Sequence, residues 1–219
     1  MNHTTINYTP GFHLRRARTV GKTLQLGMLA AFAASALLAS PVTGVTVTTD
    51  MGTFIGSDPA YLTDGSGLSS YDTGAIHDAA GPTNSWAGTS LTGTITFNLG
   101  GTYDLDGMAV WNFNSVNTYG VQDVTVRTSL DGISYSAIAG APTSFAIGSS
   151  FMAEVAETFS FSTTASYIQF EVASSYGGSS SSLSEVMFTG TAASTPEPAT
   201  YALFGAGLAV LAFFRRRCA

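Results

Sequence analysis

The stretch TITFNL, residues 94–99, alternates strictly between polar and apolar side chains. Successive side chains of a β-strand point to opposite faces of the sheet, so Ile95, Phe97 and Leu99 are expected to share one buried face. An α-helix would need apolar residues three or four positions apart instead. The stretch therefore predicts a half-buried strand.

The same two-residue period recurs in short segments throughout residues 45–190. Residues 108–113 are apolar on both faces, which is typical of a covered central strand. Val124 and Val126 alternate with polar neighbours, and Asp131-Gly132 follows as a turn signal. No segment of this region keeps a helical period. We therefore predict an all-β fold, an antiparallel β-sandwich or jelly roll, in which Trp111 belongs to the core.

Charge is distributed unevenly along the 219 residues. Seven of the eight basic residues lie near the two ends, whereas residues 41–195 hold Arg127 and thirteen of the fourteen acids. Thirteen negative charges and one positive charge give this body a net charge of −12. Such a body repels anions, which excludes nucleic acid as a partner, and attracts cations.

The N-terminal segment has the order of parts found in a secretory signal. Arg15, Arg16, Arg18 and Lys22 precede an apolar run over residues 24–38, and small residues follow. We predict a helical, cleaved signal peptide over residues 1–44, with the cut near Gly44. A permanent membrane anchor is the alternative, but the run is shorter than the ~20 residues that span a bilayer.

The C-terminal segment combines prolines, an apolar run and a basic end. Residues 191–198 form a linker that contains Pro196-Glu197-Pro198, residues 199–214 carry no charge, and residues 215–219 include three arginines. As a helix, the uncharged run would rise about 24 Å, close to the ~30 Å hydrocarbon core. We predict a transmembrane helix with a basic cytoplasmic tip, rather than a buried helix of the body.

This C-terminal arrangement resembles the PEP-CTERM sorting signal. The resemblance implies that an exosortase recognises and cleaves the chain, and that the inner membrane anchors it only transiently. The body would lie outside the cytoplasm after general secretion and would then reach the cell surface or the exterior. The residues that carry this recognition are Pro196, Glu197, Pro198, Arg215, Arg216 and Arg217.

The body resembles the discoidin-like, galactose-binding-like jelly roll of coagulation-factor C-type domains. The resemblance covers residues 55–190 and rests on DGSGL at 64–68, ITFNLG at 95–100, SLDG at 129–132 and LSEV at 183–186. It implies a module that binds carbohydrate or surfaces and is not catalytic. In its calcium-bearing members, an early loop aspartate and a carboxylate on the last strand meet at one ion. Asp64 and Glu185 match those positions, and the alternative is a solvated loop with Glu185 in an ordinary hydrogen bond.

Catalytic motifs are absent from the sequence. His77 is the body's one histidine, and no G-x-S-x-G, H-E-x-x-H or P-loop pattern occurs. We therefore predict no enzymatic activity, although a hydrolase using His77 remains an alternative. The candidate ligand-binding residues are Trp86, His77, Tyr119 and Tyr176, because aromatic rings stack on sugars and these residues lie in or beside polar loops.

These observations together predict a secreted, non-enzymatic module of the cell surface or extracellular matrix that binds exopolysaccharide. A purely structural matrix protein without a ligand is the main alternative.

Overall fold

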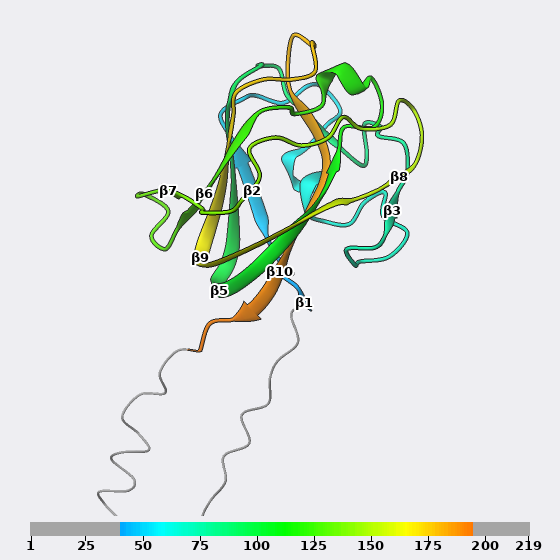
Figure 1. Ribbon diagram of the computed structural model, residues 1–219. Coiled ribbons are helices and arrows are strands. Elements are labelled where there is room, and N and C mark those ends of the chain that lie inside the picture. Colours follow the sequence, from blue (N-terminus) through cyan, green and yellow to red (C-terminus); the bar gives the residue numbers. More distant parts are fainter. Residues whose placement is uncertain (1–39, 195–219) are drawn as a thin grey trace, which may run out of the picture. The chain divides into compact units, whose positions relative to one another are not determined.

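The computed structural model describes residues 40–194 (Figure 1). The predicted signal segment, the Pro-Glu-Pro box, the predicted transmembrane helix and the basic tip lie outside this range, except for residues 40–44 of the signal segment. Within residues 40–194, no helix is both long enough and apolar enough to cross a membrane.

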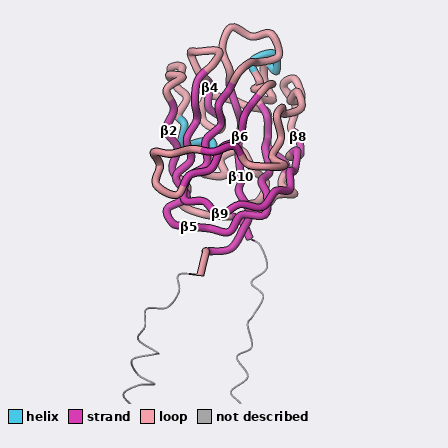
Figure 2. The backbone as a smooth tube through the Cα atoms, turned by 60° about the vertical axis from the view of Figure 1, so that its left-hand side comes forward, coloured by secondary structure: helices cyan, strands magenta, loops and turns pink. Residues whose placement is uncertain are grey.

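The described chain forms antiparallel β-structure, as predicted (Figure 2). The large sheet has the order β1-β10-β5-β9-β6-β7, with β2 paired to β5 and β4 paired to β10, and β3 and β8 form a small second sheet. The strands are β1 (Ser40–Pro41), β2 (Thr46–Thr49), β3 (Ile76–His77), β4 (Trp86–Ala87), β5 (Gly93–Asn112), β6 (Val124–Ser129), β7 (Ser136–Ala137), β8 (Glu154–Val155), β9 (Glu157–Val172) and β10 (Ser182–Ala192). Two short 3₁₀ helices, η1 (Pro59–Leu62) and η2 (Asn117–Tyr119), lie in the loops.

Two long strands bend to make both layers of the sandwich. Residues 93–98 of β5 pair with β2 and with the second half of β9, whereas residues 103–112 pair with β10 and with the first half of β9. The register breaks between Asn98 and Tyr103. Gly100 lies at this break with a φ of 74°, a left-handed conformation that glycine adopts without strain. The bend brings the two halves of β5 face to face.

The core fills the space between the two layers. Ile95, Phe97 and Leu99 are buried, which confirms the face predicted from their alternation. The Phe97 ring meets Phe170 of β9 at 4.9 Å and Phe188 of β10 at 5.2 Å between centroids, both edge to face. Aromatic packing therefore joins strands of both layers.

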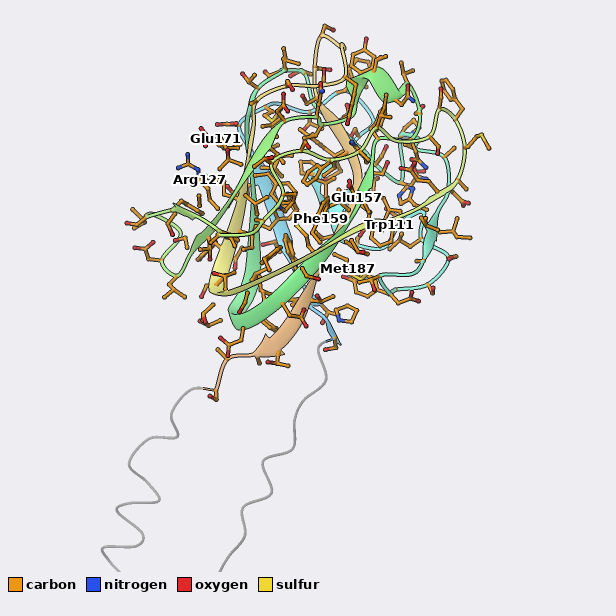
Figure 3. The ribbon with its side chains drawn as sticks, in the orientation of Figure 1. Trp111, Arg127, Glu157, Phe159, Glu171 and Met187 are labelled. Atoms are coloured by element: carbon orange, nitrogen blue, oxygen red, sulfur yellow. The ribbon has the colours of Figure 1, made fainter. Side chains whose placement is uncertain are left out.

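The outer face of β5 and β10 is also covered. Trp111 and Met187 pack there with Ala75 and Ala109, and the Trp111 indole donates to the Ala75 carbonyl at 3.1 Å (Figure 3). This second cluster explains why residues 108–113 are apolar on both faces, and it confirms Trp111 as a core residue.

The fold includes residues before the predicted start of the domain. β1 pairs with Thr189 and Gly190 of β10, and the Val42 amide donates to the Phe188 carbonyl at 2.8 Å. The Val42 side chain is buried in the core. A signal-peptide cut at Gly44 would remove all of these contacts.

Arg127, the one basic side chain in residues 40–194, forms an ion pair with Glu171 on the neighbouring strand (Figure 3). Both side chains are partly exposed, so the pair contributes little to stability. The pair leaves the other twelve acids of the body without a basic partner among the described residues.

Candidate functional site

A cleft of about 590 Å³ lies at one end of the sandwich. The start of β10 contributes to it, whereas the end of β10 and β1 lie together at the opposite end (Figure 1). Its volume falls within the ~300–1,000 Å³ of small-molecule sites. Four segments supply its uncharged lining, namely Phe54, Ala87, Gly88, Thr89, Phe113, Ser115, Val116, Tyr119, Ser179, Ser180 and Ser182.

Backbone hydrogen bonds hold one wall of the cleft. The Phe54 amide donates to the Ala87 carbonyl at 2.8 Å, which fixes the loop while the Phe54 side chain remains 63% exposed. β4 pairs in turn with the start of β10. Gly88 lies where a Cβ atom would come within 2.6 Å of the Ser181 carbonyl and 2.9 Å of the Trp86 ring. Glycine therefore allows this wall to lie close to the body.

The other wall is η2, which carries Tyr119. Buried Asn112 precedes it and donates to the carbonyls of Val121 at 2.8 Å and Ala146 at 2.7 Å. Asn117, in η2 itself, donates to the Gly148 carbonyl at 2.8 Å, and the Gly178 amide donates to Thr118 at 2.8 Å. These bonds fix η2 between two loops and hold the Tyr119 ring at the cleft.

The chemistry of the cleft is that of rings and hydroxyl groups. Phe54, Phe113 and Tyr119 offer aromatic surface, while serine and threonine hydroxyls can donate and accept hydrogen bonds. Such a surface suits a ligand that has both an apolar face and hydroxyl groups of its own.

The structure places the four predicted ligand-binding residues in different environments. Tyr119 lines the cleft. Trp86 is 0% exposed, so its ring lies beside Gly88 of the cleft lining and cannot contact a ligand in this structure. Tyr176 is half-buried, lies outside the cleft lining, and donates its hydroxyl proton to the Phe145 carbonyl. Phe54 and Phe113 were not predicted, because nothing in their local sequence separates an exposed phenylalanine from a core one.

His77 is also 0% exposed. Its Nδ1 lies 2.5 Å from the Asp78 carbonyl and its Nε2 lies 3.1 Å from the Asn84 carbonyl. Burial lowers its pKa, although these backbone contacts oppose the effect. Both ring nitrogens face the backbone, so His77 can neither reach a substrate nor serve as its base in this structure.

The loop that carries Asp64 lies against Glu185 of β10. Glu185 is 0% exposed, and its Oε1 accepts the Gly65 amide at 3.1 Å. Burial, with a smaller contribution from the charge of Asp64, raises the pKa of the Glu185 carboxyl to about 9, although the hydrogen bond from the Gly65 amide opposes the shift. The Asp64 carboxylate accepts the Ser66 amide at 2.8 Å.

Two buried oxygens at this loop have no hydrogen-bond partner, Glu185 Oε2 and Ser66 Oγ. A buried polar atom without a partner is costly, and a bound cation is one kind of partner that such an oxygen accepts. Nowhere in residues 40–194 do three or more histidine, cysteine, aspartate or glutamate side chains gather for a metal. A cation here would need hydroxyl and carbonyl oxygens beside the two carboxylates, which is the ligand set that calcium accepts. The residues therefore fit calcium, and Ser66 is a candidate ligand that the sequence did not single out.

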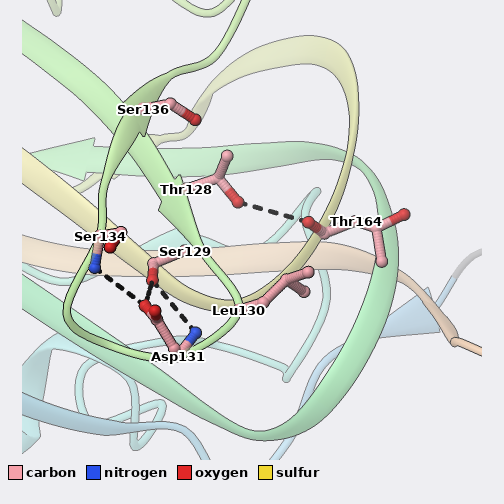
Figure 4. Close-up of a pocket in the computed structure, with 7 residues that line it drawn as sticks. All are labelled: Thr128, Ser129, Leu130, Asp131, Ser134, Ser136 and Thr164. Atoms are coloured by element: carbon pink, nitrogen blue, oxygen red, sulfur yellow. Dashed lines mark hydrogen bonds between the residues drawn. The ribbon is translucent and has the colours of Figure 1, made fainter.

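A second hollow of about 370 Å³ lies beside the β6–β7 turn (Figure 4). Asp131 lines it and accepts hydrogen bonds from the amides of Ile133 and Ser134 and from the Ser129 hydroxyl. These bonds lower the pKa of Asp131 to about 2. The carboxylate is thus occupied within its own turn, and we assign it a structural role.

Comparisons with known proteins agree with both parts of the sequence interpretation. Residues 194–217 match the PEP-CTERM protein-sorting motif. No curated protein sequence matches the chain.

Many solved structures match the fold of the body, among them two carbohydrate-binding modules. One is the family 32 CBM (carbohydrate-binding module) from C. perfringens NanJ in complex with galactose, with 12% identity, a TM-score of 0.51, and coverage of 69% of this chain and 99% of that one. The other is CBM32-1 from a family 31 glycoside hydrolase of Clostridium perfringens, with 15% identity, a TM-score of 0.50, and coverage of 68% and 95%. The chain thus carries a PEP-CTERM protein-sorting motif behind a β-sandwich with the discoidin-like fold of family 32 carbohydrate-binding modules.

Proposed function

We propose that this protein is a non-enzymatic carbohydrate-binding module that is exported and then delivered to the cell surface or the exterior. The observation that carries the proposal is the cleft, in which three aromatic rings and five hydroxyl side chains converge. Aromatic faces stack on the C–H faces of sugars, and hydroxyl groups pair with sugar hydroxyls. The galactose complex of the family 32 CBM supports the same assignment by fold likeness.

The sorting motif supports the second half of the proposal. An exosortase would recognise Pro196-Glu197-Pro198 and cleave nearby, while residues 199–214 hold the chain in the inner membrane. The released body would then meet exopolysaccharide outside the cell. Its cleft lies at the end of the sandwich opposite the end of β10, and the sorting motif begins in the sequence two residues after β10.

We further propose that calcium binds at Asp64, Ser66 and Glu185. A divalent cation would displace the proton that burial keeps on Glu185 and tie the early loop to β10, so its contribution would be to stability. The two buried oxygens without partners support this site.

Alanine at Phe54 or Tyr119 is expected to weaken sugar binding. Each side chain lines the cleft, and loss of a stacked aromatic anchor typically costs more than about 1 kcal/mol, which is roughly fivefold or more in affinity. Isothermal titration of the full-length chain in detergent, with galactose and galactan as probes, would measure the change.

The matched control is Ile133→Ala, because Ile133 is 84% exposed at the β6–β7 turn, outside the cleft. Equal losses in all three variants would contradict the cleft as the binding site. No binding of any polysaccharide in a broad panel would instead favour a structural matrix protein without a ligand.

A further inference from the structure

Among the described residues, the cleft lining offers no side chain that could neutralise an anion. None of its lining residues is charged at neutral pH. Proteins that bind carboxylate or sulfate groups usually pair them with arginine or lysine. η2, with three residues, is too short to supply a helix dipole.

The rest of the described domain cannot supply that charge either. Arg127 is the only basic side chain in residues 40–194, and it is paired with Glu171 on the β6–β9 ladder. An anionic group that entered the cleft would lose water without gaining a counter-ion, which is costly. Residues 41–195 carry a net charge of −12, which adds long-range repulsion of anions. At physiological ionic strength, salt screens this repulsion over about 8 Å.

We infer that the cleft selects uncharged saccharides and rejects uronate, sialylated and sulfated ones. The inference rests on the proposed carbohydrate-binding function and specifies the class of sugar that this function serves. It follows that an acidic exopolysaccharide could be bound only through neutral residues of its chain.

A matched pair of polymers tests the inference. Polygalacturonate and its carboxyl-reduced form differ only in whether C6 is a carboxylate or a hydroxymethyl group. We expect the full-length chain in detergent to bind the reduced polymer at least tenfold more tightly. The preference should persist at about 1 M salt, where the Debye length is about 3 Å and long-range repulsion has vanished.

Equal binding of the two polymers, or tighter binding of the acidic one, would overturn the inference while leaving carbohydrate binding intact. A preference that disappears at high salt would also overturn it, because the discrimination would then come from net charge and not from the cleft. Failure of the chain to bind any polysaccharide, neutral or acidic, would remove the proposed function, and the inference with it.

A gain-of-function variant provides the second measurement. Ser179→Arg places a cation at the exposed rim of the cleft and should raise the affinity for polygalacturonate about tenfold or more. Ser134→Arg adds the same charge at the exposed β6–β7 turn and should change this affinity less than twofold. Equal gains in both variants would contradict a local origin of the selectivity.

Discussion

Replacing Pro196, Glu197 and Pro198 by alanine is expected to leave the whole protein in the inner membrane. The box is the part of the matched motif that a processing enzyme would recognise, and the uncharged run behind it would still span the bilayer. Because processing would be blocked and not merely slowed, the secreted fraction should fall to near zero. Cell fractionation followed by mass spectrometry of the C-terminus would measure the outcome.

The control for this experiment is Thr195→Ala, which changes the residue directly before the box and should leave secretion unchanged. In the unaltered protein, the secreted C-terminus should lie near Pro198. Recovery of Cys218 in extracellular protein would show that the tail is retained and would refute the processing step.

Calcium is expected to raise the melting temperature of the protein by roughly 5–10 °C at a concentration one hundred times its dissociation constant. A ligand that binds only the folded state stabilises it by about 2.7 kcal/mol at that concentration. For a chain of this size, each kcal/mol corresponds to about 2–4 °C. Extracellular calcium sites bind at roughly 10⁻⁴–10⁻³ M, so calorimetry across about 0.1–100 mM calcium covers the range.

Two comparisons separate a specific site from general screening. Magnesium at equal ionic strength should give only the small shift that comes from screening of the acidic surface. Glu185→Gln should abolish the calcium-specific shift, since the amide keeps an oxygen that can accept the Gly65 amide proton but cannot ionise to bind a cation. Asp72→Asn removes a charge from an exposed position of the same loop and should keep the shift. Identical shifts with the two cations would dismiss the site.

The sequence predicted the strand faces because alternation is a local property. Ile95, Phe97 and Leu99 could therefore be assigned to the core from their spacing alone. The continuity of β5 could not be predicted, because Gly100 and Gly101 are typical of a turn, and only pairing with β9 on both sides of them shows one bent strand.

The candidate site was harder to predict than the fold. The hydrogen bond between the Gly65 amide and Glu185 joins residues 120 positions apart, and the interest in Asp64 and Glu185 came from family resemblance, not from any local pattern. Trp86 and Phe54 also show that local sequence does not reveal where a side chain lies. Both are aromatic residues among small polar neighbours, yet one lies fully in the core and the other is exposed at the cleft. Tertiary contacts decide this difference, and spacing along the chain does not encode them.

The place of β10 within the sheet has a consequence for the order of folding. β10 lies between β1 and β5 and also pairs with β4, yet it is the last strand of the domain in the chain. Segments that emerge earlier from a ribosome or a translocation channel lack this central partner, so the sandwich cannot close until residue 192 is available. A chain that crosses a membrane N-terminus first would thus stay unfolded until nearly all of the body has passed. The domain would complete its fold just as the sorting motif, which begins at residue 194, follows it.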